Sequence, residues 1–139
     1  MKQFFKKINV LVPSQSIINI TPQIKSFVRS TNIENGLINV SILHTTASLL
    51  IQENADPAVL RDIESFFSRL VSEDSDLYEH NSEGPDDMPA HIRSLLTNSS
   101  LSIPITNSKL ELGIWQGIYL YEHRNQSHNR KVIVNIFGE

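Results

Sequence analysis

The clearest pattern of apolar positions begins behind Asp56-Pro57. From there, apolar residues recur every three or four positions over four helical turns: Val59, Leu60, Ile63, Phe66, Phe67, Leu70 and Val71. This spacing gathers them on one face of a helix. Aspartate is a favoured N-cap residue, and proline is tolerated in the first turn because its missing N–H would have no partner there. The pattern therefore predicts a long helix, with a buried stripe made of Leu60, Ile63, Phe67 and Leu70.

Two shorter helices carry related signals. Thr21-Pro22 places a capping residue before a first-turn proline, and the apolar residues Ile24, Phe27 and Val28 follow at helical spacing. This pattern predicts a helix with Thr21 as its N-cap, ending before Gly36. A third helix is predicted after the Gly-Pro turn at 84–85, where the apolar positions are Ile92, Leu95 and Leu96.

The remaining apolar segments are short, often alternating and rich in β-branched residues, which is typical of strands. They cover residues 3–12, 16–20, 37–43, 49–51, 100–105, 110–123 with an interruption at Gly113, and 131–137. Polar turns separate the last three strands at 106–109 and 124–130. Strands cluster at the end of the chain instead of alternating with helices. The order predicts an α+β fold, with a largely antiparallel sheet and about three helices in one domain spanning residues 1–139.

Composition narrows the function classes. A chain of 139 residues with 40% hydrophobic and 19% charged residues suits one ordinary globular domain. A formal net charge of −3 argues against general binding to nucleic acid, which relies on clustered lysine and arginine. The chain has no cysteine, so disulfides, thiolate metal sites and cysteine nucleophiles are excluded. No segment approaches the ~20 apolar residues of a membrane span, and no signal-peptide pattern is visible, so we expect a cytoplasmic protein without a membrane partner.

The segment from Tyr78 to Ile92 concentrates polar chemistry around the Gly-Pro turn. It contains two histidines and four carboxylates: His80, His91, Glu79, Glu83, Asp86 and Asp87. Asp87 and His91 are four residues apart, so a helix would place them on one face and the carboxylate could orient the imidazole. Imidazole nitrogens and carboxylate oxygens bind zinc and similar metals, while the N–H groups of a first helical turn attract anions. Solvated loop charges are the alternative interpretation for Glu79, Glu83 and one aspartate.

Two polar residues follow predicted strands in the first half of the chain. His44 ends a strand with apolar neighbours, where a hydrogen-bonded structural histidine is the simplest interpretation. Asn54 stands between a strand and the long helix, and it could present its amide to a ligand.

The strand that ends at residue 123 carries polar residues in unusual places. Gln116 and Glu122 share one face of it, so they could decorate an edge or reach a pocket at the end of the sheet. Arg130 could hold a phosphate or pair with Glu122. His123 and His128 fall in the predicted turn, and we expect both at the surface.

With these residues and motifs assembled, the sequence resembles the YjbQ-like family, often labelled a secondary thiamine-phosphate synthase family. The matching blocks run in family order over nearly the whole chain: Leu43-His-Thr-Thr-Ala47, Glu53-Asn-Ala-Asp-Pro57, Gly84-Pro-Asp-Asp-Met-Pro-Ala-His-Ile92, Ile103-Pro-Ile105, Leu112-Gly-Ile-Trp-Gln-Gly-Ile118 and Glu122-His-Arg124. The Gly-Pro-Asp-Asp-Met-Pro-Ala-His string is highly specific. The chain departs from the common pattern at Thr97-Asn98 and Asn107-Ser108, where many relatives carry glycine in turns.

The resemblance implies a homotrimer with a polar pocket in which histidines bind a divalent metal, zinc or magnesium. It assigns the metal to His44, His80 and His91, with catalytic candidates at His44, Asn54, Asp87, Gln116, Glu122 and Arg130, and with Asp86 nearby. A small chain whose closing strands are apolar also favours self-association.

The implied activity is thiamine-phosphate synthesis, in which a thiazole phosphate attacks the methylene carbon of a pyrimidine diphosphate and pyrophosphate leaves. A divalent metal, Arg130 and a helix N-terminus could neutralise the charge on that leaving group. Two function classes stay open from the sequence. One is a metal-dependent enzyme acting on a small phosphorylated substrate, and the other is a non-catalytic trimeric protein that binds a metal or a small anionic metabolite.

Overall fold

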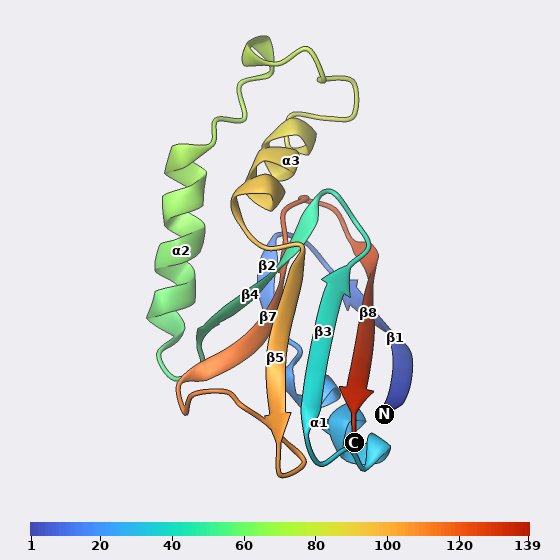
Figure 1. The fold of residues 1–139 in the computed structure, drawn as a ribbon. Coiled ribbons are helices and arrows are strands. Elements are labelled where there is room, and N and C mark those ends of the chain that lie inside the picture. Colours follow the sequence, from blue (N-terminus) through green and yellow to red (C-terminus); the bar gives the residue numbers. More distant parts are fainter.

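Two antiparallel sheets form the body of the molecule (Figure 1), which is described here for residues 1–139 from a computed structural model. The larger sheet has the strand order β1-β8-β3-β5-β6, and the smaller has the order β2-β7-β4. The strands are β1 (Lys2–Val12), β2 (Ser16–Asn19), β3 (Gly36–Ile42), β4 (Ala47–Glu53), β5 (Ser100–Thr106), β6 (Lys109–Leu110), β7 (Gln116–Glu122) and β8 (His128–Gly138). The helices are α1 (Thr21–Thr31), α2 (Pro57–Leu70), the 3-10 turn η1 (Ser75–Leu77) and α3 (Asp87–Leu96). The predicted α+β fold with antiparallel sheets and three helices is confirmed.

The core lies between the two sheets and α1. Alternate residues of β3 and β8 are buried, such as Ile38 and Val40 on β3 and Val134 and Ile136 on β8. These strands therefore follow the period of two that a sheet with one covered face requires. The smaller sheet adds Leu49, Ile118 and Leu120 to the same core.

The start of α1 differs from the prediction. Ile20, not Thr21, is the N-cap residue, and α1 has no side-chain cap. The Thr21 hydroxyl instead accepts a hydrogen bond from the backbone N–H of Ile118 at 2.8 Å and donates one to its carbonyl at 3.3 Å. The side chain of Thr21 thus connects α1 to β7 by hydrogen bonds to Ile118. Because Ile118 lies 97 residues further along the chain, the local sequence cannot reveal this role.

The long helix α2 begins as predicted, but its apolar stripe is not buried. Asp56 is the N-cap and accepts a hydrogen bond from the Ala58 N–H at 2.9 Å. None of the α2 residues is buried, and Leu70 is 55% exposed. Helical periodicity shows that one face is apolar, but it does not show what covers that face. Within this chain, α2 stands to one side of the sheets (Figure 1).

The apolar closing strands are interior strands and not edges. β8 lies between β1 and β3, and β7 lies between β2 and β4. Their apolar character is therefore explained within one chain, and it gives no support for self-association. The turn predicted at 106–109 is confirmed between β5 and β6, with Asn107 and Ser108 both at positive φ (48° and 61°).

No helix is long and apolar enough to cross a membrane.

Candidate functional site

Three side chains converge at the start of α3. Asp87 Oδ2 lies 2.7 Å from His80 Nε2 and 3.4 Å from His91 Nε2. The contact with His91 follows from the four-residue spacing on α3, as predicted. His80 reaches the same carboxylate from the preceding loop, which turns at Gly84 with φ of 106°, a conformation that favours glycine. The ligand atoms of His80, Asp87 and His91 all lie within 4.8 Å of one another.

These three residues fit a divalent metal ion. Two imidazole nitrogens and one carboxylate oxygen are a common donor set for zinc and related ions. Bonds of about 2.0–2.2 Å in a tetrahedral site would require donor atoms ~3.4 Å apart, so shifts of about 1 Å would bring the side chains into place. Such a site would leave a coordination position open for water or a substrate oxygen.

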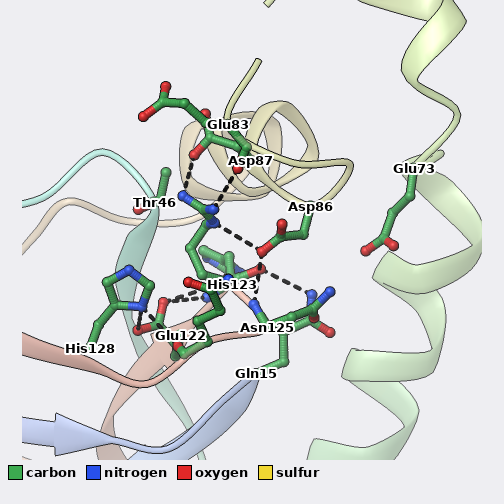
Figure 2. Close-up of polar contacts among 12 residues, drawn as sticks. Gln15, Thr46, Glu73, Glu83, Asp86, Asp87, Glu122, His123, Asn125 and His128 are labelled. Carbon is green, nitrogen blue, oxygen red and sulfur yellow. Dashed lines mark hydrogen bonds and ion pairs between the residues drawn. The ribbon is translucent and has the colours of Figure 1, made fainter. Parts of the chain in front are cut away.

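Arg124 fixes the two aspartates of the site, and the sequence analysis did not identify it. Its Nη1 donates to Asp87 Oδ1 at 2.6 Å, its Nε to Asp86 Oδ2 at 2.9 Å, and its Nη2 to the Glu83 carbonyl at 2.9 Å. Figure 2 shows Glu83, Asp86 and Asp87 close together, with dashed lines marking the contacts of this region. Because Arg124 occupies the Asp87 oxygen that faces away from the histidines, the other oxygen is left for the cluster. The Glu122-His-Arg124 block is the only sequence signal for Arg124, and a separation of 37 positions between Asp87 and Arg124 hides the contact.

The charge of Asp86 is stabilised despite burial. Burial opposes the ionised form, but hydrogen bonds from Arg124 and from the backbone N–H of Asn125 outweigh it and lower the pKa of Asp86. Both aspartates are buried while Arg124 is nearly so. The N-terminus of α3 is thus held to the end of β7 by charge-assisted hydrogen bonds.

His44 lies near this cluster but outside it. It lines a hollow of about 450 Å³ between the end of β3 and α3, together with His91 and Thr45. The backbone N–H of Lys131 donates to His44 Nε2 at 2.8 Å, so the neutral ring carries its proton on Nδ1. Burial, and then the positive charge of Arg130, lower the pKa of His44 and favour this neutral form. Its free nitrogen is therefore an N–H donor, which suits a substrate oxygen better than a metal.

Arg130 and Glu122 form a buried pair, which decides between the two interpretations of Arg130. Arg130 Nε donates to Glu122 Oε1 at 2.7 Å, and Arg130 Nη2 donates to Glu122 Oε2 and to Thr46. The backbone N–H groups of His123 and Arg124 also donate to Glu122 Oε2, at 3.0 and 3.2 Å. Glu122 and His123 lie below the aspartates in Figure 2. Because its oxygens are committed inside the protein, Glu122 acts as a structural support for the strand end.

The surface position predicted for His123 is wrong. Its side chain is fully buried, 2.9 Å from Ser48 Oγ, and its ring lies 4.1 Å from that of Tyr121. Burial, with the positive charges of Arg93 and Arg130, lowers the pKa of His123 to about 3. The strand β7 ends at Glu122, but the backbone N–H of His123 still donates to the Thr46 carbonyl at 3.3 Å, so His123 stays beside the sheet and its ring lies inside. His128 is half-exposed at the start of β8.

Asn54 and Gln116 lie elsewhere. Both line a separate hollow beside α1. Gln116 begins β7 and Glu122 ends it, so at about 3.3 Å per residue they are ~20 Å apart. Within one chain, these two amides do not join the residues around Asp87.

Comparison with known proteins identifies the family. Residues 6–139 match the family model described as UPF0047 protein YjbQ-like. A UPF0047 protein of Synechocystis is 50% identical over 130 residues, which cover 94% of this chain and 88% of that protein. The UPF0047 protein YjbQ of Salmonella typhimurium is 47% identical over 107 residues, 77% of each chain.

Solved structures agree in fold. An uncharacterized conserved protein of the YjbQ/UPF0047 family from Clostridium acetobutylicum superposes with a TM-score of 0.83 at 38% identity, covering 94% of this chain and 99% of that one. A YbjQ-like protein of unknown function from Sulfolobus solfataricus gives a TM-score of 0.85 at 22% identity over 99% of this chain and 100% of that one, which shows the shared fold alone. This chain therefore belongs to the UPF0047 family of YjbQ-like proteins.

Proposed function

We propose that this protein is a cytoplasmic, metal-dependent enzyme acting on a small phosphorylated molecule. The observation that carries the proposal is the buried carboxylate of Asp87, held by Arg124 on one oxygen and facing His80 and His91 with the other. Nitrogen and oxygen donors beside a hollow that His91 lines suit a catalytic site with an open position better than a closed structural site. A divalent ion bound there would polarise an oxygen of the substrate and neutralise phosphate charge.

The chain's own residues would bind and orient the substrate. Arg124 holds Asp87 in one orientation, which preserves the geometry of the cluster. His44 would donate from Nδ1 to a substrate oxygen in the hollow that it shares with His91. Because its pKa is lowered, His44 would remain a neutral donor at pH 7.

The specific reaction that we propose to test first is thiamine-phosphate synthesis. A bond forms between the thiazole nitrogen of the thiazole phosphate and the methylene carbon of the pyrimidine diphosphate. The carbon–oxygen bond to the diphosphate breaks, and pyrophosphate leaves with the electron pair. Its support is the family resemblance; the histidine–carboxylate cluster is compatible with other reactions of phosphorylated substrates.

The proposal is tested on protein purified without an affinity tag. Metal content per chain should be close to one in the wild type, and it should fall sharply in Asp87→Asn and His91→Ala. The matched control is His128→Ala, a half-exposed histidine outside the cluster. Equal metal content in His91→Ala and the wild type would contradict the metal site.

A screen of phosphorylated substrates, beginning with the thiazole phosphate and the pyrimidine diphosphate, tests catalysis. Turnover that disappears in His91→Ala and His44→Ala would support the enzyme. Stoichiometric metal or metabolite binding without turnover would favour the second candidate, a non-catalytic binding protein. The exposed apolar residues of α2 favour assembly with further copies of the chain, and we propose the homotrimer that the family resemblance implies.

A further inference from the structure

A second polar hollow opens beside the first turns of α1. It has a volume of about 390 Å³, and every residue that lines it is polar or proline. Two of them are the cations Lys25 and Arg29, which are four residues apart and so project from the same side of α1. Asn54 and Gln116, which lie outside α1, line the same hollow.

The cations of this hollow have no anionic partner in the chain. Lys25 and Arg29 form no ion pair, and no carboxylate lines the hollow. A neighbouring hollow shares both residues and adds Lys109, again without a carboxylate. By contrast, the arginines at 93, 124 and 130 each face a carboxylate. In a protein with a net charge of −3, an uncompensated group of three cations is a local feature that favours an anion.

The side-chain amides are oriented as additional donors. Asn19 Oδ1 accepts from the Thr21 N–H at 2.9 Å, and Gln116 Oε1 accepts from the Gly113 N–H at 2.7 Å. Because a backbone N–H can bond only to the amide oxygen, the NH₂ group of each side chain is the free end.

Asn54 has the opposite orientation. Its Nδ2 donates to the carbonyl oxygens of Ile114 at 3.3 Å and Gln116 at 3.4 Å, which leaves its Oδ1 as an acceptor. An anion would bind the donors, and Oδ1 could accept from a hydroxyl of the same ligand.

We propose that this hollow binds the phosphate group of a small phosphorylated molecule that also carries a hydroxyl. Lys25 and Arg29 supply charge, Arg29 can donate to two phosphate oxygens at once, and the amides of Asn19 and Gln116 add neutral donors. The start of α1 adds the positive end of a helix dipole and has no acidic residue in its first turn. A hollow of this size fits a small molecule and not a polymer. The site is separate from the Asp87 cluster, and the inference does not depend on the proposed function.

Calorimetric titration with inorganic phosphate and pyrophosphate, in the presence of EDTA, tests this site without any contribution from a bound metal. We expect saturable binding of one anion per chain, weakened about tenfold or more in Lys25→Gln and Arg29→Gln, since each loses a charge-assisted contact. Arg61→Gln removes the same charge from an exposed position on α2 and should bind as the wild type does.

A second measurement follows the side-chain amide resonances of Asn19 and Gln116, which should shift during the titration. If Arg61→Gln weakened anion binding as much as Lys25→Gln and Arg29→Gln do, the effect would be one of general electrostatics and the proposed site would be overturned. Anion binding that does not saturate would also overturn it. Loss of anion binding in His91→Ala with unchanged binding in Arg29→Gln would assign the anion to the Asp87 cluster and also overturn it.

Discussion

At the scale of single residues, the arrangement around Asp87 depends on the different partners of its two carboxylate oxygens. Oδ1 is taken by Arg124, and Oδ2 faces His80 and His91. A carboxylate without the arginine could rotate, and a buried charge without a partner is costly. Arg124 therefore determines the direction of the carboxylate that is central to the site, although it comes from the segment that follows β7.

Replacing Arg124 tests this role. Arg124→Gln leaves Asp86 and Asp87 without their shared cation, and the free energy of unfolding should fall by about 3 kcal/mol, as when one partner of a buried pair is removed. Arg124→Lys keeps the positive charge but loses the planar group that can bond to two carboxylates at once. Its free energy of unfolding should therefore lie between that of Arg124→Gln and that of the wild type. Denaturant melts measure both. The control Arg61→Gln is at an exposed position and should change the free energy of unfolding by no more than about 0.5 kcal/mol. A change as small as this in Arg124→Gln would show that the contacts of Arg124 with the two aspartates contribute little to stability.

His123 should make stability depend on pH. Its folded pKa is about 3, whereas an unfolded histidine has a pKa near 6.5. Below pH 6.5, His123 is protonated in the unfolded chain but stays neutral in the folded protein. The free energy of unfolding therefore falls as the pH decreases, by up to ~1.4 kcal/mol per pH unit, until the pH approaches 3.

The measurement is a series of denaturant melts between pH 7 and pH 5. His123→Gln should be less stable than the wild type at pH 7, because the packing against Tyr121 is lost, but its stability should decline less, by about 2 kcal/mol at pH 5. His128→Gln serves as the control and should follow the wild-type curve. Parallel curves for His123→Gln and the wild type would mean that another group causes the acid sensitivity.

At the scale of elements, the turn between β5 and β6 carries strain that the sequence makes visible. Asn107 and Ser108 both have positive φ, the conformation of a type I′ turn that favours Asn-Gly. Asparagine tolerates it, whereas serine incurs the steric penalty of a Cβ atom in the left-handed region.

Ser108→Gly should therefore stabilise the protein by about 0.5–1 kcal/mol, since the relief of this penalty exceeds the extra entropy of glycine in the unfolded chain. Ser100→Gly, at an exposed position in β5 with ordinary strand geometry, should destabilise it by a similar amount. Denaturant melts that show destabilisation by both substitutions would exclude strain at Ser108.

The sequence predicts the helices and strands that carry the site better than it predicts how these elements come together in space. Order and type of the main elements follow from local periodicity, and so does the contact of Asp87 with His91, because helical spacing alone determines it. The approach of Arg124, the interior position of His123 and the bond of Thr21 to Ile118 depend on strand pairing between distant residues, which no local pattern encodes. The exposure of α2 was missed for a related reason: an apolar face indicates burial without naming its partner.

At the scale of the whole molecule, α2 carries exposed apolar surface. Phe66 and Leu70 of α2 remain exposed, as do Leu77 in η1 and Ile114 and Trp115 before β7, and other exposed apolar side chains lie on β1 and α3. The apolar stripe of α2 packs only partly on its own chain: Phe67 lies against Tyr121 of β7, with ring centroids 6.1 Å apart, while Phe66 and Leu70 stay exposed. A second copy of the chain would cover the exposed part without requiring any further protein, since symmetric assembly is the common way to cover such a face.

For the homotrimer proposed above, we expect light scattering at micromolar concentration to give three times the chain mass of 15.8 kDa. Phe66→Glu and Leu70→Glu place a charge in the contact, where desolvating it without a partner is costly, and should release monomers. Leu11→Glu is the matched control, because Leu11 is equally apolar and exposed but lies on β1, on the other side of the molecule from α2 (Figure 1). It should leave the trimer intact. A wild-type mass of one or two chains would refute the trimer, and dissociation by Leu11→Glu but not by Leu70→Glu would move the contact from α2 to the edge of the larger sheet.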